Sequence, residues 1–118
     1  GIDEISTTGH TKVSECRGGA VHTFFIHPSE FGLPKAAPGD LRGGDAVENA
    51  AIIRTMLDGK PGPAREIVLL NAGAALFVAG RTSSVRDSIS CAGAAIDSGA
   101  ARETLDRMVR SSQTAVAV

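Results

Sequence analysis

The sequence is poorest in aromatic residues and in cysteine. It has no tryptophan, no tyrosine and only four phenylalanines among 118 residues, which argues against a surface on which nucleic-acid bases stack. The two cysteines, Cys16 and Cys91, fit no metal-ligand spacing and are too few for a disulfide framework. Reduced thiols are typical of cytoplasmic proteins, and we therefore expect a cytoplasmic location.

An excess of charge is also missing. The 12 basic and 13 acidic residues leave a net charge of −1, so no long-range field attracts a nucleic acid or a membrane surface. The longest apolar run, 67–79, is shorter than the roughly 20 residues that a membrane-spanning helix needs. We expect neither a nucleic-acid partner nor a membrane partner. Because the sequence opens at Gly1 without an initiator methionine, we expect a fragment of a longer protein.

The run 67–79 is the feature around which the rest of the chain is expected to fold. Its only polar side chain is Asn71, and it carries no charge. Alanine, leucine and glycine outnumber β-branched residues, which favours a helix over a strand. A helix that is apolar on every side must be buried on every side. The small residues 72–75 should let neighbouring helices approach closely, and Asn71 should bond a neighbouring backbone group.

The remaining pattern predicts a β-hairpin followed by four helices. Strands are expected at 11–16 and 20–26, because Arg17-Gly18-Gly19 between them is a hairpin turn signal. Pro28 should end the second strand, and 29–42 should be a connecting loop with room for one short helical turn. The helices are expected at about 45–58, 63–79, 84–98 and 100–112. The end of the chain should fray from Ser111, with 114–118 as a tail.

Two of these helices have clear start signals. Asp45 with Glu48 and Ser84 with Asp87 each have the spacing of a capping pair. Behind the caps, apolar residues recur at helical spacing and should form buried stripes. The stripes are Ala46, Ala50, Ile53 and Leu57 in the first helix and Val85, Ile89, Ala92 and Ile96 in the third.

Asp3 and Glu4 are the residues whose chemistry best suits a site. Adjacent carboxylates in an extended chain point to opposite sides, so they can address two cations, or one cation and its surroundings. Mg²⁺ takes few protein oxygens and fills its octahedron with water and substrate phosphate. The hydroxyl-rich loop 6–9 could flank such a site. By composition alone, a solvated acidic pair is the more common explanation.

Two further motifs suggest chemistry more weakly. Gly43-Gly44-Asp45 resembles a phosphate-binding helix start. However, Asp45 places a carboxylate where an anion would bind, so we expect capping instead. His10, His22 and His27 lack metal-binding spacing, and we expect His22 and His27 to be solvated.

Several short motifs occur in order along the chain. They are Gly1-Ile-Asp-Glu-Ile-Ser6, Phe31-Gly-Leu33, Leu41-Arg-Gly-Gly-Asp45 with Glu48-Asn49-Ala50, Leu69-Leu-Asn-Ala72 and Ala95-Ile-Asp-Ser-Gly-Ala-Ala101. No single motif is specific. Their order and spacing together resemble the C-terminal part of the anthranilate phosphoribosyltransferase family, over residues 1 to about 109.

The resemblance implies an α/β fold, of which this chain would hold a fragment. Family members have a small helical domain and a larger α/β domain, form homodimers through the helical one, and bind phosphoribosyl pyrophosphate with Mg²⁺ between the domains. The amine of anthranilate attacks the anomeric carbon and pyrophosphate leaves, as a step of tryptophan biosynthesis. The family's metal-binding Asp-Glu pair matches Asp3 and Glu4. Residues 1–113 would be the C-terminal part of the glycosyltransferase α/β domain.

Parts of the family's site have no counterpart in this sequence. These are the Gly-Thr-Gly-Gly-Asp loop that cradles pyrophosphate, the arginine that orients anthranilate, and the helical domain. We therefore expect no transferase activity from the chain alone. Unpaired strand edges and apolar patches should make it self-associate or bind the N-terminal remainder of the same protein.

Two other functions remain open. One is a related phosphoribosyltransferase or pyrimidine nucleoside phosphorylase-like enzyme with another acceptor. The other is a free-standing, non-catalytic binding module, which predicts a compact monomer with little exposed apolar surface.

Overall fold

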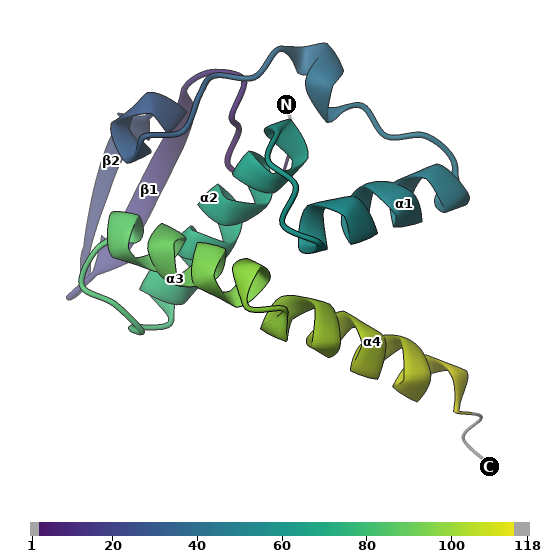
Figure 1. Cartoon of the computed structure of the whole chain (residues 1–118). Helices are drawn as coiled ribbons and strands as arrows, with labels where there is room; N and C mark the ends of the chain where they lie inside the picture. The colour runs from purple at the N-terminus through teal and green to yellow at the C-terminus, as the bar shows by residue number, and fades with distance from the viewer. Residues whose placement is uncertain (1–2, 115–118) are drawn as a thin grey trace.

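A computed structural model describes residues 3–114, which form a hairpin followed by four α-helices, as predicted (Figure 1). The strands are β1 (Thr11–Arg17) and β2 (Ala20–Ile26), and the helices are α1 (Ala46–Leu57), α2 (Pro63–Val78), α3 (Val85–Asp97) and α4 (Ala100–Gln113). Each predicted helix boundary lies within one residue of the observed one.

The hairpin is closed by its two glycines. β1 pairs with β2 in antiparallel register, with Val13 opposite Phe24. Gly18 and Gly19 have φ angles of 58° and 79°, which is the left-handed backbone that a two-residue hairpin turn requires. Arg17 was expected in the turn, but it is the last residue of β1. Val13 and Phe24 line the space between the hairpin and α2, whereas Phe25 on the opposite face is 63% exposed.

The tightest packing in the described chain joins α2 to α3. A Cβ atom at Gly73 of α2 would lie 2.5 Å from Cγ1 and 3.0 Å from the backbone N of Ile89, so only glycine allows this approach. The expected close contact at the small residues of α2 is thus confirmed. Leu70, only 1% exposed, forms the core with Leu33 and Ile89. The α3 stripe is buried as predicted at Ile89, Ala92 and Ile96, with Val85 half-buried.

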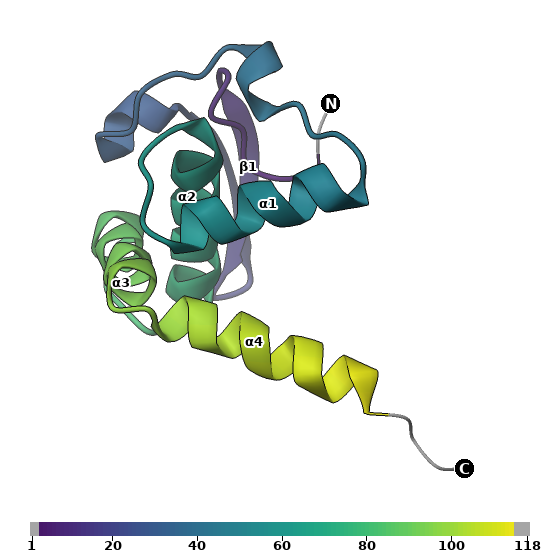
Figure 2. The ribbon, with the colours of Figure 1, turned by 45° about the vertical axis from the view of Figure 1, so that its right-hand side comes forward.

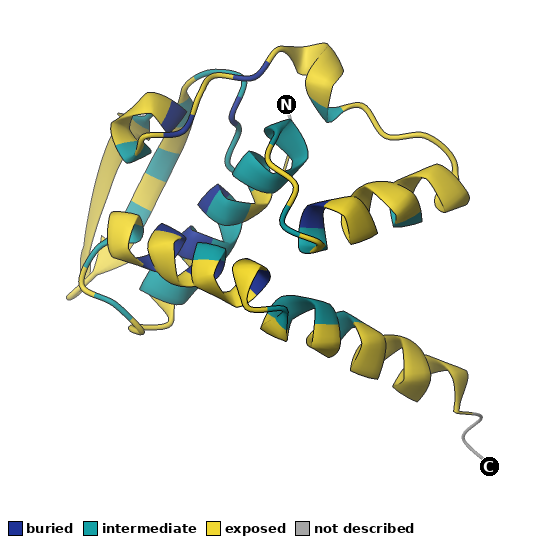
Figure 3. Ribbon diagram, in the orientation of Figure 1, coloured by how far each residue is buried: buried dark blue, intermediate teal, exposed yellow. Residues whose placement is uncertain are grey.

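The prediction that α2 is buried on every side is wrong. Its buried residues are Leu70 and Gly73, whereas Val68, Ala75 and Val78 are exposed (Figure 3). The reason is coverage: α3 packs along one side of α2, α1 touches it sparsely, and the hairpin stands off from it. The rest of the described chain therefore does not wrap around this apolar helix.

The predicted stripe of α1 is also largely uncovered. Ala46 and Ile53 are exposed, and Ala50 and Leu57 are only half-buried. Met56, which lies outside the stripe, is instead the buried residue of α1. The helix meets the rest of the molecule mainly at its C-terminal end (Figure 2), and its apolar residues Val47, Ile52 and Ile53 are exposed.

Two smaller predictions need correction. The segment after β2 contains two 3-10 helices, η1 (Pro28–Phe31) and η2 (Pro38–Leu41), and not a loop with one helical turn. Each begins at a proline, whose fixed φ suits the first helical position. Residues 111–113 continue α4 and are not frayed, while 115–118 lie outside the described residues. α4 extends away from the body (Figure 1) and has no fully buried residue. No helix among residues 3–114 is long and apolar enough to cross a membrane.

Candidate functional site

Asn71 attaches the N-terminal acidic segment to α2. Its side-chain Oδ1 accepts a hydrogen bond from the backbone N of Ile5 at 2.9 Å, and its Nδ2 donates to the carbonyl oxygen of Ile5 at 2.9 Å. The same Nδ2 also donates to the carbonyl oxygen of Ile67 at 3.0 Å. The expectation that this amide bonds backbone groups is confirmed. The two bonds to Ile5 hold the chain directly after the carboxylates in one position.

Asp3 and Glu4 are presented at the surface from this anchored segment. Both are exposed, and neither forms an ion pair with any residue in the range 3–114. Ile5, the next residue, is half-buried and packs against the Leu33–Leu70–Ile89 core. The exposed carboxylate of Glu4 is therefore followed directly by an apolar residue that is fixed to the core. This arrangement leaves two carboxylates available for a ligand while their attachment is fixed.

The loop that follows the carboxylates is ordered by its own hydroxyls. Ser6 Oγ lies 2.7 Å from Thr8 Oγ1 and accepts from the backbone N of Thr8 at 3.0 Å. Thr7 is fully buried, and its carbonyl oxygen accepts from the backbone N of Ala36 at 2.9 Å. The buried Thr7 Oγ1 has no hydrogen-bond partner among residues 3–114. The hydroxyls of Ser6 and Thr8, which were expected to flank a cation, bond one another and the backbone. Their evident effect is to fix the loop.

Within the described chain, no cluster of three or more histidine, cysteine, aspartate or glutamate side chains is suited to hold a metal ion. Asp3 and Glu4 nevertheless provide oxygens that only accept, which is what Mg²⁺ binds. Two such residues suffice for this ion because water and substrate phosphate commonly supply its remaining ligands. The donor set therefore fits magnesium and does not fit a structural metal that is enclosed by protein ligands.

The glycine-rich start of α1 is occupied by its own side chains. Asp45 Oδ1 accepts from the backbone N of Glu48, and Glu48 Oε2 accepts from the backbone N of Asp45, both at 2.9 Å. The Asn49 amide bonds both the N and the O of Gly44. The predicted capping box is confirmed, and these backbone donors are not free for a phosphate.

The histidines and cysteines do not converge on a site. His22 is exposed as expected, but His27 is half-buried and caps η1, with its Nδ1 accepting from the backbone N of Ser29 at 3.3 Å. The ring of His10 packs against that of His27, with 4.8 Å between ring centroids. Cys16 and Cys91 are both free thiols at the surface.

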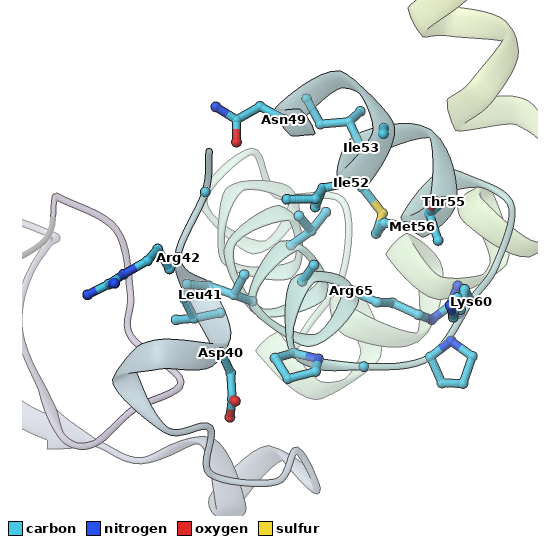
Figure 4. Close-up of a pocket in the computed structure, with 18 residues that line it drawn as sticks. Asp40, Leu41, Arg42, Asn49, Ile52, Ile53, Thr55, Met56, Lys60 and Arg65 are labelled. Atoms are coloured by element: carbon cyan, nitrogen blue, oxygen red, sulfur yellow. The ribbon is translucent and has the colours of Figure 1, made fainter. Parts of the chain in front are cut away.

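Sequence reasoning missed a groove between η2, α1 and α2, which we call the η2–α1–α2 groove (Figure 4). Its volume is about 680 Å³, and Leu41, Ile52, Met56 and Val68 contribute to its walls. Ile52 and Met56 lie four residues apart on α1, which is itself a helical spacing. This second spacing was a signal for the groove, and Ile53 of the predicted stripe lines the groove as well.

Comparisons with known proteins give a consistent result. Residues 1–102 match the model of the glycosyl transferase family, a/b domain. Over 113 residues, 96% of its length, the chain is 50% identical to anthranilate phosphoribosyltransferase of Azorhizobium caulinodans, and this match covers 33% of that protein.

Solved structures are also similar. The anthranilate phosphoribosyltransferase from Thermus thermophilus superposes with a TM-score of 0.83 and 36% identity, over 93% of this chain and 32% of that one. A variant of the Saccharomyces cerevisiae enzyme, solved with Mg bound, superposes with a TM-score of 0.79 and 28% identity, over 90% of this chain and 31% of that one. The chain thus spans about a third of the length of each of these relatives.

Proposed function

The chain belongs to the glycosyl transferase family, a/b domain, and we propose that it is the C-terminal part of an anthranilate phosphoribosyltransferase. The complete enzyme would transfer the phosphoribosyl group from phosphoribosyl pyrophosphate to the amine of anthranilate, with release of pyrophosphate, in tryptophan biosynthesis. The observation that carries this proposal is the 50% identity that extends over 96% of the chain. It agrees with the resemblance drawn from the ordered motifs.

In this proposal Asp3 and Glu4 are ligands of Mg²⁺. Magnesium, when bound, supplies positive charge that offsets the negative charge developing on the departing pyrophosphate. The carboxylates need only accept, and no proton transfer is asked of them. Asn71 is a positioning residue: by holding both backbone groups of Ile5, it fixes where the chain leaves the acidic pair. A relative that was solved with Mg bound supports the choice of metal.

The remainder of the site would come from outside this chain. Residues 1–113 would form the C-terminal part of the α/β domain, and the remaining part of the protein would bring the pyrophosphate loop, the anthranilate site and the helical domain. We propose that the complete enzyme is a cytoplasmic homodimer and that this chain alone is inactive. Exposed apolar side chains such as Val78 (85%) and Phe25 disfavour the rival function of a free-standing module.

The test is complementation. The chain is co-expressed with the part of the Azorhizobium caulinodans relative that lies outside the aligned region, and anthranilate consumption is followed by fluorescence in the presence of phosphoribosyl pyrophosphate and Mg²⁺. We expect turnover by the co-purified complex and none by the chain alone.

Variants then address the carboxylates. Asp3→Asn and Glu4→Gln should each lower kcat by about 100-fold, because removing a group that stabilises transition-state charge typically has an effect of that order. Their melting temperatures should not change. Glu103→Gln, an exposed acid on α4, is the matched control and should leave kcat unchanged. Full activity of both site variants, or turnover by the chain alone, would contradict the proposal.

A further inference from the structure

The η2–α1–α2 groove exposes apolar side chains that a stable surface normally covers. Ile52 is 40% exposed and Val68 is 37% exposed, and they stand on helices α1 and α2 respectively. Figure 4 shows Ile52 and Met56 of α1 with Leu41 close to the helix α2 behind them. Exposed apolar patches of this kind usually mark an interface.

Helix α1 itself is unusual for a surface helix. Among its 12 residues only Glu48 and Arg54 are charged, and Glu48 is engaged in the capping box. A helix that is apolar on most of its circumference is buried on most sides in a stable structure. α1 has one buried residue, Met56, so most of the cover that its sequence calls for is absent from the described residues.

The polar rim of the groove is cationic. Arg42 and Lys60 both line it, and neither forms an ion pair with residues in the described part of the chain. Asp40, the carboxylate on the same rim, accepts a hydrogen bond from the backbone N of Ala37 at 2.8 Å and is occupied in capping η2. A complementary occupant is therefore apolar in its centre and acidic at its edge.

A second copy of this chain is poorly suited to the groove. α1 already forms a wall of the groove, so the other sparsely covered helix that a copy could offer is α4, which extends away from the body in Figure 1. Its charged residues are Arg102, Arg107 and Arg110 against Glu103 and Asp106, a net positive charge next to a cationic rim. Asp106 also lies 3.8 Å from Arg102 of its own helix.

We propose that the η2–α1–α2 groove is the docking surface for an apolar segment with acidic flanks that belongs to the remaining part of the protein. This inference rests on the proposed function, in which the chain supplies about a third of an enzyme of the length of its relatives. The groove then joins the part that carries Asp3 and Glu4 to the part that carries the rest of the site.

The experiment measures complex formation, independently of activity. A tagged form of this chain is co-expressed with the unmatched part of the Azorhizobium caulinodans relative, and the amount co-purified per tagged chain is determined. Ile52→Asp and Val68→Asp place a carboxylate in the groove at positions that are 40% and 37% exposed, where we expect the isolated chain to tolerate it. Val47→Asp, on the same helix but outside the groove and 78% exposed, is the matched control.

We expect each groove variant to lower the co-purified amount at least about tenfold, because a single buried apolar contact is already worth that factor. Val47→Asp should have no effect, and circular dichroism should show the same helix content for all variants. Equal complex formation by all variants, or no complex with the unaltered chain, overturns the inference. The inference is also overturned if the chain associates with itself and the groove variants abolish this self-association. A groove-dependent complex without turnover would sustain the inference and reject the proposed function.

Discussion

Two regions of the molecule differ sharply in how closely they are packed, although each contains a helix that is poor in charge. The α2–α3 pair is packed so closely that Gly73 meets Ile89 with no room for a methyl group. α1 and α4 touch each other and the body only sparsely, and α4 has no buried residue. Yet α1 is as poor in charge as much of α2. An apolar sequence therefore shows that a helix needs other residues packed against it, but it does not show whether those residues belong to this chain.

The difference also separates two kinds of role. The tight region holds the Leu70 core and, through Asn71, the acidic segment that precedes Ile5. The open region presents the groove. The closely packed region would thus position the carboxylates, and the sparsely packed region would bind a further part of the protein.

The largest effect should come from the core of the tight region. Leu70→Ala should lower the free energy of unfolding by about 3 kcal/mol, because it removes a side chain that is 1% exposed and leaves a cavity. Ile53→Ala in the open region removes a similar group that is 44% exposed and should cost under about 1 kcal/mol. Urea titration followed by circular dichroism measures both. Equal losses would show that the two regions do not differ in packing.

A second comparison uses two glycines of the same tight pair. Gly73→Ala should destabilise the chain by about 2 kcal/mol, since the new methyl must displace Ile89, including its backbone. Gly93→Ala on α3 should be neutral or stabilising, because its Cβ would meet Leu69 at 3.8 Å, an ordinary contact, and alanine favours the helix. The two melting temperatures, measured under one buffer condition, should move in opposite directions or differ by several degrees. Destabilisation by both variants would show that the contact between α2 and α3 is too close for an added methyl group at either glycine.

The elements of the fold could be predicted from local signals. Capping pairs at Asp45 and Ser84, the glycine turn of the hairpin and the helical spacing of apolar residues all act within a few residues of the chain. Their outcome does not depend on what packs against them, so the helix boundaries agree with the sequence. Burial depends on neighbours. The same spacing rule succeeded for Ile89, which packs between α3 and α2, and failed for Ile53, which is 44% exposed.

The candidate site was predictable only in part. Asp3 and Glu4 could be named from the family resemblance, and their exposure is what acceptor ligands need. That Asn71 anchors them through Ile5 was not foreseeable, because the two residues are 66 positions apart and the partner is a backbone group. Sequence spacing carries no information on such a contact. The groove was missed for a similar reason, since η2 and α2 build it from distant segments.

Two amide clamps allow the third comparison. Asn71→Leu should cost about 1.5 kcal/mol, because the backbone N and O of Ile5 lose partners in a partly buried setting. Asn49→Leu removes an equivalent clamp on Gly44 at an exposed position, where water replaces it, and should cost under about 0.5 kcal/mol. Hydrogen exchange should show lost protection at the Ile5 amide in the first variant only. Unchanged exchange at Ile5 would mean that Asn71 does not position the acidic segment.

The smallest effect should separate local from global stability. Ser84→Ala and Asp45→Ala each remove a side-chain cap, at 3.1 Å from the backbone N of Asp87 and 2.9 Å from that of Glu48. Such a loss is worth about 1 kcal/mol to the helix concerned. Because α3 is part of the core, Ser84→Ala should lower the global free energy of unfolding by that amount.

Because α1 contacts the rest of the described chain only sparsely, we expect it to open without the core. Asp45→Ala should then speed exchange of the α1 amides and leave the global transition unchanged. Asp45→Asn retains an acceptor and should restore most of the protection, which ties the effect to the cap. A global loss in Asp45→Ala equal to that in Ser84→Ala would mean that α1 unfolds together with α2 and α3. In that case the open region would be as cooperative as the packed one, and its sparse contacts would carry more free energy than their burial indicates.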